Sequence, residues 1–279
     1  MMRDMTFGQY YPTESFVHKL DPRIKILLLI AYIAMIFTAQ NFISLGVAII
    51  FMLVSVFASR VPLTSVLKSI KAIIFLVIFT AVINVFFYRK GEGDHALFWI
   101  VTREGLINAG FLAIRLVSLV AGSSVLTLTT TPVSLTDGIE SLLKPLSLVK
   151  FPVHELALIM SIALRFIPTL ADETDRIINA QKARGADFES GNVFSRVKAL
   201  IPVLIPLLVS AFRRADELGD AMDARCYSGA KKRTKYKKLK IGARDIVAVL
   251  FAGAAIAGII LTNIYYSGII SCFSALFGV

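Results

Sequence analysis

Two short stretches of the sequence combine an arginine with small neighbours. Each is a three-residue step: Ala183, Arg184 and Gly185 in the first copy, and Ala224, Arg225 and Cys226 in the second. A guanidinium group binds a carboxylate through two parallel hydrogen bonds, and small neighbours allow the arginine to enter a groove. These residue types suit a docking contact with an acidic partner, although for either copy alone an ordinary arginine at a helix C-terminus is the preferred interpretation.

Both steps are predicted to end helices. The segment 171–182 precedes the first step and has opposite charges at the i,i+3 and i,i+4 spacings of an exposed helix. Gly185 suits the left-handed position just beyond a helix end, which places Arg184 in the last turn. The helix dipole alone favours such an arginine. The second copy, at the end of 213–225, shares an Ala-Asp-Glu lead-in with the first, and this repetition predicts two equivalent contacts on two partner subunits.

Composition places these steps in an integral membrane protein. The 279 residues are 56% hydrophobic, with a mean hydropathy of +0.74, whereas soluble domains have about 45–50% apolar residues. Two cysteines and three scattered histidines provide neither a disulfide framework nor a metal cluster. Much of the net charge of +11 lies in the run Lys231–Lys240. We expect this run to bind anionic lipid headgroups, with no role for nucleic acid.

Five apolar stretches approach or reach the length of about 20 residues that a bilayer-spanning helix needs. They are 24–40, 42–59, 70–88, 105–130 and 246–266. Lysines and arginines gather before the first stretch, between the second and third, and before the last, which marks these sides as cytoplasmic. The N-terminus is then inside and the C-terminus outside. Because the N-terminus is polar through Lys25 and several more spans follow, the first stretch is expected to be a retained span and not a signal peptide.

The long segment before the last span carries both arginine steps. Its apolar stretches 153–170 and 197–214 are interrupted by charges or prolines, so we expect buried or interfacial helices there. The predicted fold is an all-α integral membrane protein of about five spans, with a helical cytoplasmic domain inserted before the last span. Its parts are 1–130, 131–245 and 246–279. Counting the two interrupted stretches as spans gives the alternative of seven.

Motifs for catalysis are missing from the sequence. It contains no GxxxxGK[ST] phosphate-binding loop, and "HELAL" at 154–158 lacks the second histidine of a zinc-protease helix. The predicted spans hold no paired carboxylates of the kind that proton-driven transport uses. Arg115 is the one charge well inside a span, with Asn84 as a candidate partner. A self-contained permease or channel, and a membrane-embedded enzyme, remain the alternatives to a non-catalytic scaffold.

The last span carries two overlapping pairs of small residues at i,i+4 spacing. They are Gly253 with Ala257, and Ala254 with Gly258. Such pairs let another helix approach closely in a membrane. The partner is predicted to be either another helix of this chain or a second membrane protein.

Several segments resemble the T component (EcfT) of energy-coupling factor transporters, the prokaryotic ABC-type importers of vitamins and metals. They are "LDPRIKILLL" at 20–29, "TTTPVSLTDGIESLLKPL" at 129–146, "ALRFIPTLADETDRIINAQKARG" at 163–185 and "ADELGDAMDAR" at 215–225. The resemblance runs over nearly the whole chain. Its most specific part is the Ala-Arg-Gly step on each of two coupling helices.

The resemblance implies a coupling subunit in the plasma membrane that is not itself an enzyme. Two cytoplasmic ABC-type ATPase subunits would use ATP and Mg²⁺, and a substrate-binding S component would hold the vitamin or other micronutrient. This chain would bind no cofactor or metal. Arg184 and Arg225 would lie in grooves of the two ATPases, and the small residues of the last span would face the S component or another helix. Cys226 stands where the family has glycine.

Overall fold

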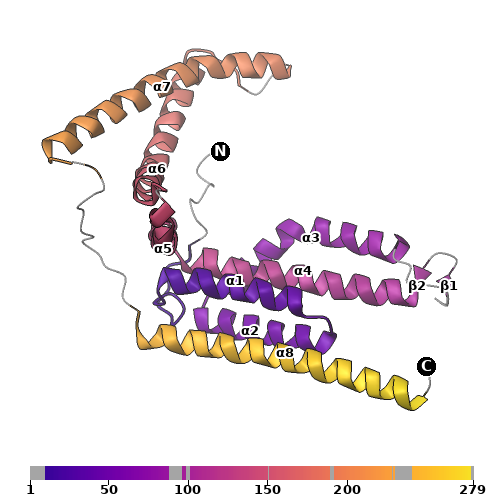
Figure 1. Ribbon diagram of the computed structural model, residues 1–279. Helices are drawn as coiled ribbons and strands as arrows, with labels where there is room; N and C mark the ends of the chain where they lie inside the picture. Colours follow the sequence, from indigo (N-terminus) through magenta and orange to yellow (C-terminus); the bar gives the residue numbers. More distant parts are fainter. Residues whose placement is uncertain are drawn as a thin grey trace. The chain divides into compact units, whose positions relative to one another are not determined.

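The computed structural model describes residues 10–87, 96–98, 101–149, 151–188, 192–227, 229 and 241–277. Apart from one short antiparallel hairpin, its regular structure is helical (Figure 1). In chain order the elements are α1 (Pro22–Thr38), α2 (Phe42–Ser59), α3 (Leu63–Phe87), β1 (Ala96–Phe98), β2 (Val101–Thr102), α4 (Arg103–Thr129), α5 (Pro132–Leu143), η1 (Lys144–Val149), α6 (Val153–Ala183), α7 (Val193–Ala224) and α8 (Ala243–Phe277). The predicted all-α class is confirmed.

The chain divides into two compact units. The first, called here the bundle unit, consists of Gly8–Gly138 and Leu239–Val279 and holds α1–α4 and α8. The second, the inserted unit, is built around Ile139–Lys238 and holds α6 and α7. Both arginine steps therefore belong to the inserted unit.

Five described helices are long and apolar enough to cross a membrane. Their membrane-length segments are Phe42–Ser59, Leu63–Phe86, Gly105–Thr129, Val153–Ala183 and Ala243–Tyr266. The expected number holds, but the set differs from the predicted one. The stretch 24–40 forms the 17-residue α1, which is not among the five, whereas 153–170 is part of α6, which is. The chain is a multi-pass membrane protein.

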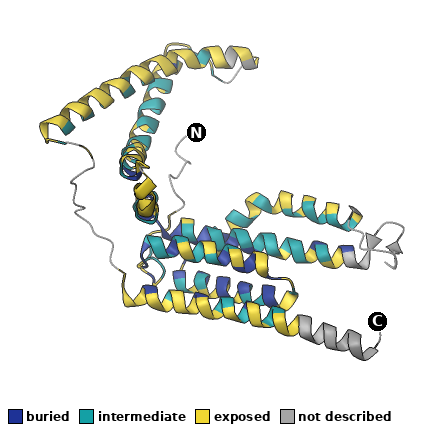
Figure 2. Cartoon of the chain, viewed as in Figure 1, coloured by how far each residue is buried: buried dark blue, intermediate teal, exposed yellow. Residues whose placement is uncertain are grey.

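The core of the bundle unit lies along α1, α2, α4 and α8, and Figure 2 shows buried residues on α1, α2 and α4. Tyr32 of α1 is at its centre. The Tyr32 hydroxyl donates a hydrogen bond of 2.8 Å to the carbonyl of Ser118 in α4. The Tyr32 ring stacks on that of Phe51 in α2, at 6.0 Å between centroids. Polar and aromatic contacts thus hold one side chain against two helices.

Gly122 makes room for this ring. A β-carbon added to Gly122 would lie 2.0 Å from Cε1 of Tyr32, well inside van der Waals contact. Gly110, in the same helix, has nothing within 4 Å of the equivalent position. The close packing of α4 on α1 therefore requires a glycine at 122 but not at 110.

We predict that Gly122→Ala destabilises the bundle unit. Alanine gains about 1 kcal/mol of helix propensity over glycine, but overpacking a fixed ring costs about 1–3 kcal/mol, so the net effect is a loss. The matched control Gly110→Ala gains the propensity without the clash. Denaturation by sodium dodecyl sulfate in mixed micelles should place the two midpoints on opposite sides of the wild-type value. Equal midpoints for both variants would contradict the role given to Gly122.

Two buried charges connect three helices at one end of the bundle unit. Lys25 of α1 is only 6% exposed, and its Nζ donates to the carbonyl of Thr129 at 2.9 Å, to Oγ1 of Thr130 at 3.2 Å and to the carbonyl of His18 at 3.3 Å. Asp245 of α8 accepts from the backbone N–H of Asp21 at 2.8 Å. The start of α1 is thereby tied to the end of α4 and the start of α8.

Arg115 and Asn263 stabilise the opposite end of α1. The Arg115 guanidinium donates to the carbonyl of Ala39 and lies over the Phe111 ring, 4.6 Å from its centroid. Asn263 of α8 donates to the carbonyl of Thr38 at 2.9 Å. The side chain of Asn84, the candidate partner of Arg115, instead donates to Thr80 of its own helix. Arg115 therefore has a structural role.

In the inserted unit, α6 and α7 run through their prolines as single helices of 31 and 32 residues. A proline has no N–H to donate, so the carbonyl four residues before it loses its helical partner. Pro206 leaves the carbonyl of Pro202 free in this way, and the side-chain amide of Gln181 in α6 donates to it at 3.4 Å. A contact between the helices thus replaces a bond within one helix.

Candidate docking site at two helix ends

The first arginine step forms the end of α6 as a Schellman motif. Arg184 is the C-cap residue, and Gly185 follows it with a left-handed φ of +89°. The N–H of Gly185 donates to the carbonyl of Lys182 at 3.0 Å, and the N–H of Ala186 to that of Gln181 at 3.0 Å. These two bonds define the motif. The predicted left-handed position of Gly185 is confirmed.

The second step repeats this geometry at the end of α7. Arg225 follows the last helical residue, Ala224, and Cys226 has a φ of +57°. The N–H of Cys226 donates to the carbonyl of Asp223 at 2.9 Å, and the N–H of Tyr227 to that of Met222 at 3.0 Å. Cys226 thus adopts the left-handed backbone conformation that Gly185 has in the first copy, although it carries a β-carbon.

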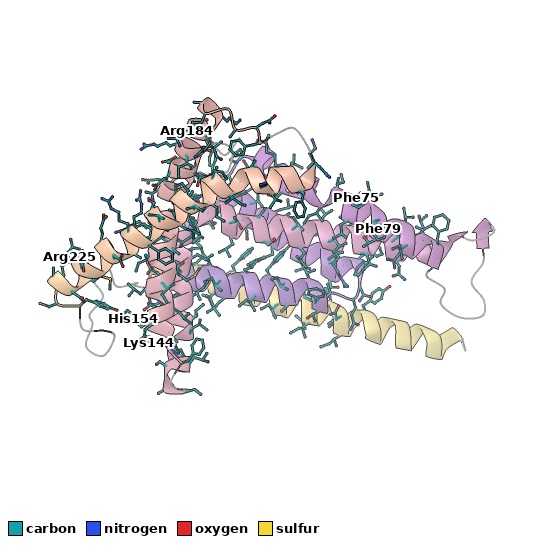
Figure 3. The ribbon with its side chains drawn as sticks, turned by 90° about the horizontal axis from the view of Figure 1, so that it is seen from above. Phe75, Phe79, Lys144, His154, Arg184 and Arg225 are labelled. Carbon is teal, nitrogen blue, oxygen red and sulfur yellow. The ribbon has the colours of Figure 1, made fainter. Side chains whose placement is uncertain are left out.

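Both arginines are exposed at separate ends of the helix pair, as Figure 3 shows. Neither guanidinium forms a hydrogen bond or ion pair with any residue that the structure describes. The flanking Ala183 and Ala224 are also exposed. Each helix end therefore presents a free planar cation with little side-chain bulk beside it, a shape that can enter an acidic groove.

We predict opposite effects of glycine and alanine at the two left-handed positions. A left-handed non-glycine residue costs about 1–2 kcal/mol, so Cys226→Gly should slow hydrogen exchange of the Tyr227 amide by about 5- to 30-fold. Gly185→Ala should speed exchange of the Ala186 amide by at least that factor. Exchange measured by mass spectrometry on peptides that cover the two helix ends checks both. Unchanged exchange in both variants would show that these amides are not held as described.

Glu173, eleven residues before Arg184, connects α6 to α7. Its Oε1 accepts from the Ser210 hydroxyl at 2.6 Å, and its Oε2 accepts from the Arg214 guanidinium at 2.8 Å. Because hydrogen bonds to a charged group are stronger than neutral ones, the Glu173 contacts are expected to hold the two helices more firmly than the 3.4 Å bond from Gln181 to Pro202 does. Glu173 thereby joins α6 to α7 through two side-chain hydrogen bonds.

We predict that Glu173→Ala weakens the packing of α6 on α7, because two charge-assisted hydrogen bonds between the helices are lost. Glu217→Ala is the matched control. Glu217 pairs with Arg213 within α7, with side chains 63% and 80% exposed, and such a pair contributes well under 1 kcal/mol. The free energy of unfolding of the two variants should differ accordingly. A loss as large for Glu217→Ala would refute the assignment.

The small residues of the last span lie on two faces of α8. Gly253, Ala254 and Ala257 are exposed, and a β-carbon on Gly253 would meet nothing within 4 Å. A β-carbon on Gly258 would lie 3.7 Å from Cγ1 of Val47 in α2. The structure therefore brings Gly258 alone of the four against another helix of this chain.

Two features separate the sequence prediction from the structure. The basic run Lys231–Lys240, expected to bind anionic lipid, lies outside the described residues. The contacts of Lys25 and Glu173 were not predicted. A lysine inside an apolar stretch was a visible signal for the Lys25 contacts, but its acceptors in Thr129 and Thr130 are about a hundred residues away along the chain.

In the described part of the chain, no group of three or more His, Cys, Asp or Glu residues could hold a metal ion.

Comparison with known sequences identifies the relatives of this chain. Residues 13–236 match the family CbiQ, described as "Cobalt transport protein". The chain is 52% identical over 270 residues to the energy-coupling factor transporter transmembrane protein EcfT of Clostridium kluyveri, covering 95% of this chain and 99% of that protein. It is 49% identical to EcfT of Ruminiclostridium cellulolyticum, over 88% of this chain and 92% of that protein. For EcfT of Bacillus subtilis the identity is 45%, over 90% and 95%.

These matches first define a class, the membrane proteins of transport systems. Within that class, the chain belongs to the EcfT family, the transmembrane T components of energy-coupling factor transporters. It is thus a membrane component of such a transporter.

Proposed function

We propose that this chain couples ATP hydrolysis by two cytoplasmic ABC-type ATPase subunits to uptake of a vitamin or other micronutrient through a membrane S component. One observation carries the proposal. Arg184 and Arg225 occupy equivalent positions in two Schellman motifs, at the ends of two long helices that contact each other. One exposed arginine on each helix suits one contact with each of two related subunits.

The helix-end geometry favours docking for an electrostatic reason. In each motif, backbone N–H groups satisfy carbonyls at the helix end, so the guanidinium is not needed for capping. Its five donors remain available for a carboxylate of the partner. The closed turn also fixes the backbone beside the arginine, which lowers the entropy lost on binding.

The contacts between α6 and α7 provide a route for the movement that ATP binding produces. When the two ATPases close, Arg184 and Arg225 move with them. The helices are linked through Glu173 and through Gln181, so a displacement of α6 also moves α7. The exposed apolar side chains of α6 and α7, such as Ile159 and Phe212 at 60% and 69% exposed, supply a surface for the S component, which releases its substrate inward when it tilts.

In this proposal the chain contributes no catalytic group. ATP and Mg²⁺ are used in the partner subunits, and substrate selectivity belongs to the S component. With 24–40 as the first span, the N-terminus lies in the cytoplasm and the C-terminus outside a prokaryotic plasma membrane, which the lysines and arginines beside the sequence-predicted spans support. The inserted unit then meets the ATPases on the cytoplasmic side.

We predict that Arg184→Ala combined with Arg225→Ala abolishes ATP-driven uptake. Truncating one side of a desolvated charge pair costs about 2–5 kcal/mol, so each contact should weaken by at least about 30-fold. The measurement is co-purification with the two ATPases, together with substrate uptake by proteoliposomes that contain the whole complex.

The matched control is Arg213→Ala. Arg213 is an arginine of α7 with a side chain 80% exposed, and its replacement should leave assembly and uptake unchanged. Full assembly and uptake in the double variant would exclude docking through the two helix ends. Loss of both with Arg213→Ala as well would show that total charge, and not position, determines binding.

A further inference from the structure

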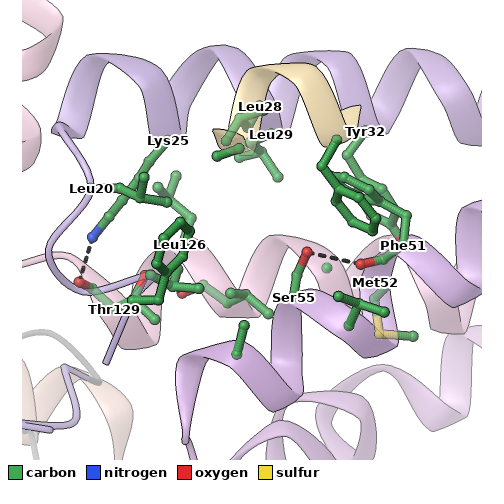
Figure 4. Close-up of a pocket in the computed structure, with 18 of the residues that line it drawn as sticks. Leu20, Lys25, Leu28, Leu29, Tyr32, Phe51, Met52, Ser55, Leu126 and Thr129 are labelled. Carbon is green, nitrogen blue, oxygen red and sulfur yellow. Dashed lines mark hydrogen bonds between the residues drawn. The ribbon is translucent and has the colours of Figure 1, made fainter. Parts of the chain in front are cut away.

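An apolar cavity lies inside the bundle unit. It has a volume of about 260 Å³ and is lined by α1, α2, α4, α8 and the segment before α1. Figure 4 shows it extending from Lys25 and Thr129 at one end to Tyr32 and Phe51 at the other. Its lining is mainly aliphatic and aromatic, and its polar groups are already satisfied. The Lys25 ammonium has three acceptors, and the Ser55 hydroxyl donates to the Phe51 carbonyl at 2.8 Å.

A basic recess adjoins this cavity. The recess has a volume of about 620 Å³ and shares Phe16 and Ala58 with the cavity wall. Its charged residues are Glu14, Lys19, Arg60 and Arg244. Lys19 is paired with Glu14 at 2.7 Å. Arg60 and Arg244 are exposed, and they form no hydrogen bond or ion pair with any residue within the described ranges.

We propose that the cavity and the recess together bind one anionic phospholipid. Part of an acyl chain occupies the cavity, and the phosphate group lies on Arg60 and Arg244. The apolar cavity complements the acyl chain of such a lipid, and the basic recess complements its anionic headgroup. Guanidinium groups bind phosphate through parallel hydrogen bonds.

The size of the cavity also favours an acyl chain. Pockets for small molecules have volumes of about 300–1,000 Å³, so 260 Å³ suits a stretch of a narrow chain better than a compact ligand. A protein segment is a poorer match, because the polar groups of the cavity are bonded internally and offer nothing to a backbone. The bound chain would contact α1, α2 and α8 together, and the lipid would act as a structural part of the bundle unit.

Binding of defined lipids to the purified full chain tests the proposal. Native mass spectrometry would compare phosphatidylglycerol with phosphatidylcholine carrying the same acyl chains. Two arginines near the headgroup should give a preference of roughly 30-fold for phosphatidylglycerol. Arg60→Gln with Arg244→Gln should remove that preference. The control is Arg165→Gln with Arg213→Gln, which changes the charge equally on exposed residues of the inserted unit and should retain it.

A second pair of variants tests the cavity. Ala58→Leu fills the space and should reduce retention of both lipids about tenfold, whereas Ala34→Leu, on the exposed face of α1, should not. The proposal is wrong if the wild type shows no preference, if the Arg60 and Arg244 double variant keeps it, or if Ala58→Leu binds both lipids as Ala34→Leu does. It is equally wrong if Ala58→Leu leaves lipid binding intact but blocks assembly of the transporter, since the cavity then receives a protein segment.

Discussion

The structure depends on how the carbonyl groups at helix ends find donors. The last carbonyls of a helix have no partner within it, and an apolar bilayer offers no water to replace one. In the bundle unit, side chains from other helices fill this need: Lys25 donates to the end of α4, while Arg115 and Asn263 donate to the end of α1. In the inserted unit, Gln181 does the same for a carbonyl freed by proline. Each of these donors thereby fixes the packing of one helix against another.

The same constraint separates structural arginines from arginines available to a partner. Arg115 is engaged by the Ala39 carbonyl and the Phe111 ring, so it is held inside the bundle unit against the end of α1. At the ends of α6 and α7, the carbonyls are satisfied by the backbone of the following residues instead. Arg184 and Arg225 are free for that reason. Exposure alone does not distinguish these two arginines from other surface arginines. Their equivalent positions at two helix ends, without a partner among the described residues, distinguish them.

Features confined to a short stretch of sequence, such as an apolar run or a glycine at a helix end, predicted the corresponding helices and helix ends. The apolar stretches 42–59 and 105–130 correspond to α2 and α4, because span length is set by the bilayer. Gly185 marked a helix end because few other residues tolerate its backbone conformation. The sequence did not reveal that α7 continues through Pro206, since the Pro202 carbonyl that this proline frees accepts from Gln181 of another helix. Nor did it reveal the acceptors of Lys25 or the Glu173 contact, which join residues far apart in the chain.

Cys226 shows which property of the arginine step matters for its geometry. Cys226 stands where glycine is expected, yet the second helix ends in the same way as the first. The φ angle is +57° at Cys226 and +89° at Gly185. The strain of a left-handed β-carbon is about 1–2 kcal/mol, and two backbone hydrogen bonds of about 1 kcal/mol each are enough to offset it. The left-handed turn and its two bonds, and not the glycine itself, therefore place the arginine at the tip of the helix.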